Sequence, residues 1–221
     1  MPNQPSDLKS FIEATSDGDF VILDTETTGL DSAAEICDLA IVTPQGDILF
    51  NQLIKPANLI GPDASRVTGI TNQLVGDCPT WNELHHEIRS LLMGRKVVTW
   101  NATFDRKMFH QSDEQANMPS PRWGEISQWY CAMTAFAERY GEWNSWHGNY
   151  KWQKLITAAE YYFTAHTGEL HRALADALTT ALVVKEMRTD VLNLRSETYL
   201  PWGPVEWSDI PGSPRARESK S

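Results

Sequence analysis

Two carboxylate residues, Asp24 and Glu26, stand two positions apart at the end of an apolar run over residues 20–23. Side chains two apart on a strand point to the same face and lie about 6.6 Å apart along it, so this spacing lets both carboxylates bind hard cations. An isolated pair of this kind is most often part of a solvated turn. Here the apolar run predicts a buried strand, and charges that end a buried strand are costly unless they are paired or bound to metal. The pair is therefore a candidate cation site.

Two further carboxylates and one histidine are candidates for the same site. Asp105 follows a predicted strand and lies at a predicted helix start, where an acid is also favoured for purely structural reasons. Asp176 lies among alanine and leucine residues, a setting in which an unpaired carboxylate is expensive. His171 precedes Asp176 by five positions, which would place the two side chains on different faces of one helix. We therefore expect His171 on a loop before the helix, after Thr167 and Gly168, where a movable imidazole suits general-base chemistry.

The chain around these residues alternates between strand and helix patterns. The apolar periodicity predicts strands at residues 20–24, 36–42, 48–54, 96–100 and 126–130, a loop at 117–122, and helices at 7–15, 81–92, 104–111, 132–140, 151–163 and 173–192. Three antiparallel strands followed by strands that alternate with helices are typical of a mixed sheet in an α/β sandwich. The predicted fold class is therefore α/β.

Length and composition limit the domain organisation and the mode of binding. The chain has 221 residues, which suits one domain over residues 1–200 and an extension over 201–221 whose end, from residue 211, is expected to be disordered. Its 19 basic and 29 acidic residues give a net charge of −10, whereas a protein that holds nucleic acid by charge alone is strongly basic. If this chain handles a polyanion, metal ions must supply part of the positive charge.

Cysteine usage and hydropathy indicate the compartment. The three cysteines form no C-x-x-C pair, so neither a disulfide framework nor a zinc knuckle is expected. No apolar run approaches the roughly 18 residues that a membrane span needs. We expect a soluble, cytoplasmic protein with no membrane partner.

Three segments of the chain together resemble the three exonuclease motifs of the DnaQ-like, DEDDh-type 3′–5′ exonucleases. They are residues 24–30, 101–105 and 171–177, with further similarity at 38–42, 53–56 and 67–71, so the resemblance covers roughly residues 20–187. Each motif alone is degenerate, but all three occur in the right order. One departure is Thr68, since members related to the bacterial proofreading subunit often carry a histidine at that position. The resemblance implies a ribonuclease H-like fold, with a mixed five-stranded sheet flanked by helices.

The resemblance also implies a role for each matching residue. It assigns two divalent ions, Mg²⁺ or its substitute Mn²⁺, to the four carboxylates Asp24, Glu26, Asp105 and Asp176, with His171 as the general base. Two ions held by oxygen ligands suit an in-line displacement at phosphorus. The residues implied to line the groove for the terminal nucleotide are Thr27, Leu30, Asn101 and Phe104, with Leu30 placed to wedge between bases. Leu30 and Phe104 also have a simpler interpretation as core residues.

Three other features leave alternatives open. Five tryptophans occur between residues 123 and 152, and they suit core packing, base stacking or a protein interface. A group of basic residues is either a phosphate track or a solvated surface; it comprises Arg89, Arg95, Lys96, Arg106 and Lys107. Trp202 and Trp207, in residues 201–211, belong either to a strap over the domain or to a docking peptide.

These observations favour one function over two alternatives. The leading hypothesis is a metal-dependent exonuclease that hydrolyses DNA from the 3′ end and releases nucleoside 5′-monophosphates. The first alternative is an exoribonuclease, because the motifs do not distinguish the two sugars. The second is a proofreading-type subunit or docking module bound to a polymerase or a repair factor, and several relatives are homodimers.

Overall fold

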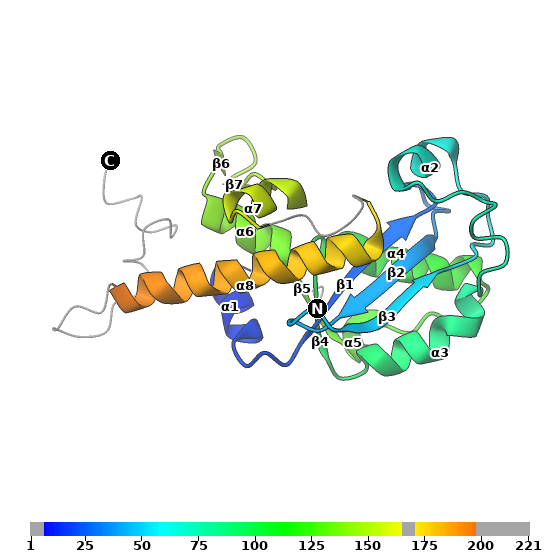
Figure 1. Cartoon of the computed structure of the whole chain (residues 1–221), viewed down its shortest axis with the longest axis horizontal. Helices are drawn as coiled ribbons and strands as arrows, with labels where there is room; N and C mark the ends of the chain where they lie inside the picture. The colour runs from blue at the N-terminus through cyan, green and yellow to red at the C-terminus, as the bar shows by residue number, and fades with distance from the viewer. Residues whose placement is uncertain (1–6, 165–170, 198–221) are drawn as a thin grey trace.

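The computed structural model describes residues 7–164 and 171–197, including side chains up to residue 193 (Figure 1). The predicted C-terminal extension over residues 201–221, with Trp202 and Trp207, lies outside the described residues, as do Thr167 and Gly168.

A five-stranded mixed sheet forms the centre of the protein, as predicted. Its order is β3-β2-β1-β4-β5, where β1 is Val21–Thr27, β2 Ile36–Val42, β3 Ile48–Leu53, β4 Lys96–Thr99 and β5 Gln128–Cys131. The first three strands are antiparallel, whereas β4 and β5 run parallel to β1. All seven residues of β2 are buried, as expected for a strand covered on both faces.

Helices cover both faces of this sheet. The described helices are α1 Leu8–Thr15, α2 Pro62–Thr68, α3 Trp81–Leu92, α4 Ala102–Gln115, α5 Trp123–Ile126, α6 Ala132–Tyr140, α7 Leu155–Tyr161 and α8 Ala173–Glu197. Figure 1 shows α8 crossing in front of β1 and β2 while α4 lies behind them. The apolar core fills the space between these layers, and no described helix is long and apolar enough to cross a membrane.

Local chemistry explains where several helices begin and end. Asp7 caps α1 by accepting a hydrogen bond from the Ser10 N–H, and Thr80 and Glu83 form a capping box at the start of α3. Gly141 ends α6 in the left-handed conformation, which glycine adopts without the penalty of a Cβ atom.

The structure differs from the sequence prediction mainly at element boundaries. Helix α4 spans 102–115 rather than 104–111, because Asn101 caps it earlier and its buried face continues to Asp113. The helix predicted at 151–163 is limited to α7, since a short hairpin of β6 (Trp143–Asn144) and β7 (Asn149–Tyr150) precedes it. Strand β5 begins two residues later than predicted because α5 takes residues 123–126. Helix α8 continues to Glu197.

A fully buried carboxylate organises the aromatic part of the core. Both indole N–H groups of Trp81 and Trp123 donate to Asp113, each at 2.8 Å, and the Ser120 hydroxyl donates to it at the same distance. The Nε2 atom of His85 lies 3.3 Å from the same carboxylate. Asp113 therefore satisfies the polar groups of two buried tryptophans at once, which a buried N–H requires.

We expect Asp113→Ala to lower the free energy of unfolding by about 3 kcal/mol, because it leaves two buried indole N–H groups without an acceptor. Urea denaturation followed by circular dichroism measures this change. The matched control is Glu114→Ala, at an exposed neighbour, which should change stability by less than about 0.5 kcal/mol. Equal stabilities for the two variants would contradict the role given to Asp113.

Candidate active site

Asp24 and Glu26 lie on β1 with their side chains on the same face, as the strand alternation predicts. Both carboxylates are close enough to Asp176 of α8 for its charge to raise their pKa values. The intervening residue, Thr25, points to the other face, and its hydroxyl donates to Asp105 Oδ1 at 2.8 Å. The C-terminal half of β1 thus supplies two acids directly and positions a third.

The start of α8 brings the remaining two predicted residues to this strand. Glu26, His171 and Asp176 each offer one ligand atom, and these three atoms lie within 4.8 Å of one another. His171 is exposed and sits in a turn just before α8, as predicted, with a left-handed backbone (φ 62°). This turn lets the imidazole approach Asp176, which a continuous helix would not allow.

Asp105 lies in the first turn of α4, where the helix begins directly after β4. Asn101 caps this helix by accepting from the Phe104 N–H at 3.4 Å. Because β4 is parallel to β1, the acid at the start of α4 reaches the same end of the sheet as Asp24. All four predicted carboxylates therefore converge on the C-terminal end of β1, close enough for the charges of the others to raise the pKa values of Asp24 and Glu26.

An ion pair that the sequence analysis missed holds the start of α8 against the sheet. Asp38 of β2 is buried and lies directly beside Glu26 in the strand register. Its Oδ2 atom accepts from Arg172 Nε at 2.9 Å and from the Ala173 N–H at 3.3 Å. Arg172 follows His171 directly, so Asp38 fixes the turn that presents the imidazole. The only sequence signal was its inclusion in the similarity over residues 38–42.

Desolvation and like charge raise the pKa values of the acids on β1. Burial, together with the charges of Asp176 and Asp38, raises the pKa of Glu26 to about 8, whereas Arg172 opposes the shift. Burial also raises the pKa of Asp24 well above its ordinary range, with the charges of Asp105 and Glu26 acting in the same direction. These carboxylates carry more negative charge than their surroundings accommodate without a cation.

Asp105 experiences the same desolvation, which raises its pKa to about 6, but the hydrogen bond from Thr25 limits the shift. The donor set of carboxylate oxygens and one imidazole fits divalent ions such as Mg²⁺ or Mn²⁺. Such an ion would neutralise the charge that raises the pKa values, so the residues present fit a divalent metal site.

The four predicted groove residues lie around this cluster in different environments. Leu30 is 78% exposed, so it is not a core residue, whereas Phe104 is half-buried and packs against the core. Thr27 is buried and donates to the Gly29 carbonyl at 2.7 Å, and Asn101 is the α4 cap described above. Of these four residues, Leu30 is the one with a largely exposed apolar side chain.

Three members of the predicted basic group lie away from the acids, whereas Arg106 and Lys107 directly follow Asp105 in α4. Lys96 begins β4, beside the start of β1 and at the end of the sheet away from Asp24, and it pairs with Asp17 at 2.6 Å. Arg89 and Arg95 are exposed residues just before it. For these three cations the structure favours the solvated-surface interpretation over a phosphate track.

The chain matches known proteins over most of its length. The exonuclease family covers residues 21–184. An exonuclease of Escherichia phage 186, CP81, is 35% identical over 170 residues, covering 75% of this chain and 86% of that protein. The DNA polymerase III epsilon subunit of Aquifex aeolicus is 29% identical over 185 residues, covering 82% and 85%. This chain belongs to the exonuclease family, and it is a DnaQ-like enzyme of the 3′–5′ exonuclease class, as its motifs predict.

Solved structures confirm the fold. The nuclease domain of 3′hExo, a DEDDh family member bound to rAMP, superposes with a TM-score of 0.59 at 17% identity, covering 78% of this chain and 92% of that domain. An Escherichia coli ExoI–ssDNA complex gives a TM-score of 0.63 at 18% identity, covering 77% and 40%. At these identities the likeness establishes the ribonuclease H-like mixed sheet predicted from the motifs.

We expect Arg172→Ala to lower the free energy of unfolding by about 3 kcal/mol, because it leaves the buried Asp38 carboxylate without its partner. The double variant Arg172→Ala/Asp38→Asn should recover part of this loss, since the remaining side chain carries no charge. Urea unfolding of the unaltered protein, Arg172→Ala, Asp38→Asn and the double variant forms the cycle, with Arg66→Ala at an exposed ion pair as the control. Strictly additive losses would rule out the coupling between Asp38 and Arg172.

We expect the metal-free protein to lose stability as the pH rises from about 5 to about 8. The folded-state pKa of Glu26 is about 8, above its ordinary value of 4.5. The folded state therefore favours the protonated acid, and the free energy of unfolding falls as this acid ionises with rising pH. Thermal unfolding in EDTA across this range measures the decline, and added Mg²⁺ should reverse it at the alkaline end. The variant Glu26→Gln should show a shallower decline; a midpoint that rises with pH would refute the expectation.

Proposed function

We propose that this protein is a metal-dependent 3′–5′ exonuclease that hydrolyses DNA from the 3′ end and releases nucleoside 5′-monophosphates. The observation that carries the proposal is the convergence of Glu26, His171 and Asp176 within 4.8 Å, beside Asp24 and Asp105. The similarity to a DNA polymerase III epsilon subunit favours DNA over RNA as the substrate. It also favours a polymerase or repair factor as a protein partner.

Two divalent ions, Mg²⁺ or Mn²⁺, are the proposed cofactors, and when bound they stabilise the charge on the attacking and leaving oxygens. The residues that would hold them are Asp24, Glu26, Asp105 and Asp176. Thr25 positions Asp105 by donating a hydrogen bond to it. Asp38 positions the start of α8, which carries Asp176, by binding Arg172. Desolvation strengthens the electrostatic attraction between each carboxylate and a cation, because the surrounding protein screens the charges less than water does.

His171 is the proposed general base. Its imidazole is exposed beside Glu26 and Asp176, so it can accept a proton at a ring nitrogen from the attacking water. The water oxygen bonds to phosphorus as the bond to the 3′ oxygen of the preceding nucleotide breaks. That oxygen takes up a proton, which leaves a 5′-monophosphate and a shortened strand with a new 3′-hydroxyl.

The groove residues would hold the terminal nucleotide. The exposed Leu30 is placed to wedge against a base, and the half-buried face of Phe104 is available for apolar contact. Thr27 and Asn101 are polar residues at the ends of β1 and β4. Single-stranded or frayed ends suit this arrangement, because a base must leave its stack to enter such a groove.

We expect purified protein to shorten 5′-labelled single-stranded DNA from its 3′ end with Mg²⁺ or Mn²⁺ and not with EDTA. Asp24→Ala should abolish this activity, and His171→Ala should lower kcat by about 10²–10⁴-fold. Gel electrophoresis of the products, with matched RNA in parallel, measures the rate and the preferred sugar.

The matched controls are Asp63→Ala and His86→Ala, which remove exposed groups of the same type elsewhere. Both should retain the activity of the unaltered protein. Full activity in both Asp24→Ala and His171→Ala would refute the proposed site, and faster digestion of RNA would assign the enzyme to the exoribonucleases.

A further inference from the structure

Three tryptophans form an exposed aromatic surface on the segment that follows α6. Trp146 is 88% exposed, Trp152 64% and Trp143 51%. The two other tryptophans of the predicted aromatic stretch, Trp123 and Trp129, are buried in the core. Packing therefore accounts for only part of this stretch, and we call the three exposed residues, with Lys151 and Lys154, the hairpin surface.

Hydrogen bonds of the β6–β7 turn hold Trp146 outward. The Asn144 side chain accepts from the Trp146 N–H at 3.1 Å and from the His147 N–H at 3.3 Å. The Gly148 N–H donates to the Asn144 carbonyl at 2.9 Å. At the base of the hairpin, Trp143 packs edge-to-face on Tyr150, with ring centroids 5.1 Å apart. The turn thus holds the Trp146 side chain in solvent, where it is not packed in the core.

The charge around these tryptophans differs from that of the whole chain. Residues 143–159 contain Lys151, Lys154 and His147 but no carboxylate, although the chain has a net charge of −10. Lys151 pairs with Glu142 at 2.5 Å, and Lys154 is exposed at the start of α7. Aromatic residues interleaved with cations are the pattern that binds unpaired bases and their backbone.

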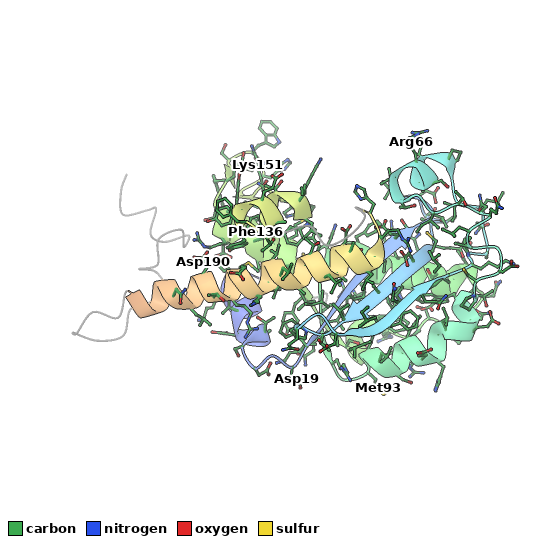
Figure 2. All side chains as sticks on the ribbon, in the orientation of Figure 1. Asp19, Arg66, Met93, Phe136, Lys151 and Asp190 are labelled. Atoms are coloured by element: carbon green, nitrogen blue, oxygen red, sulfur yellow. The ribbon has the colours of Figure 1, made fainter. Side chains whose placement is uncertain are left out.

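An ion pair joins the end of α6, which leads into the hairpin, to the later part of α8. Arg139, near the end of α6, contacts Asp190 of α8 through Nε at 2.6 Å, and Tyr162 donates to the same carboxylate at 3.3 Å. Asp190 lies fourteen residues beyond Asp176 on α8, or about 21 Å at 1.5 Å per residue. Figure 2 shows Lys151 on the same side of α8 as Arg66 of α2, and Figure 1 shows the N-terminal end of α8 between these two regions.

We propose that the hairpin surface is a stacking platform for unpaired bases of the nucleic-acid strand whose 3′ end occupies the acid cluster. This inference rests on the proposed function and extends it to single-stranded substrates. Because the Arg139–Asp190 contact lies about 21 Å along α8 from Asp176, a strand must extend several nucleotides from its 3′ end to reach the platform. Trp146 and Trp152 supply the stacking faces, and Lys154 faces the backbone phosphates.

A protein hot spot is the main alternative use of exposed tryptophans. The composition of the segment favours nucleic acid instead, because it combines several flat rings with cations, and the acid that flanks it, Glu142, is paired with Lys151.

The test compares Trp146→Ala and Trp152→Ala with the unaltered full-length protein on oligothymidylates of about 20 and about four nucleotides. Fluorescence anisotropy in EDTA measures Kd without cleavage, and initial rates with Mg²⁺ measure KM and kcat. We expect each variant to raise Kd and KM for the long strand about five-fold or more. We expect no change for the short strand and no change in kcat, and Trp146→Phe should restore binding in part.

The matched control is Ile48→Ala, which removes a 55% exposed apolar side chain from β3. Matched oligouridylates distinguish an RNA platform from a DNA platform. Unchanged Kd for the long strand in both tryptophan variants would overturn the platform while leaving the exonuclease itself intact, and loss of self-association in Trp146→Ala would assign the surface to a protein contact. If no strand is cleaved but the length-dependent loss of binding is seen, the platform stands and the proposed function fails.

Discussion

Repulsion among carboxylates at the C-terminal end of β1 is the constraint on which the rest of this structure depends. Four acids from three distant parts of the chain meet there, next to the buried Asp38. The raised pKa values of Asp24, Glu26 and Asp105 express the cost of that arrangement in a desolvated setting. Clusters of acids with raised pKa values occur mainly at functional sites. These donors fit a pair of divalent cations at a scissile phosphate.

The surrounding fold keeps the acids together against this repulsion. Thr25 donates to Asp105 from the reverse face of β1, and Arg172 brings a positive charge to the buried Asp38. The first contact joins β1 to α4 and the second joins β2 to the start of α8, so the two helices are fixed on opposite sides of the sheet. The left-handed backbone of His171 follows from the same geometry, because Arg172 and the Ala173 N–H must both reach Asp38 while the imidazole faces Glu26.

The sequence predicted the site better than it predicted its supports. Strand alternation predicted that Asp24 and Glu26 share one face, and helix periodicity predicted that His171 lies before the helix. Both predictions succeeded because they need only local geometry. The contact between Asp38 and Arg172 spans 134 positions, and the contact between Trp81 and Asp113 also depends on tertiary packing. No local pattern encodes such pairings. The β6–β7 hairpin was missed for a related reason: its strands have two residues each, too few for a period of two to appear.

The distance in sequence between the motifs also has a consequence for biosynthesis. Asp24 and Glu26 are translated early, whereas His171, Arg172 and Asp176 emerge from the ribosome only after most of the sheet has been made. A nascent chain therefore lacks His171 and Asp176 beside Glu26 until α8 has been made and has docked on β1 and β2. Prematurely terminated chains lack the same residues, so the order of synthesis itself delays any hydrolytic activity until the whole domain is folded.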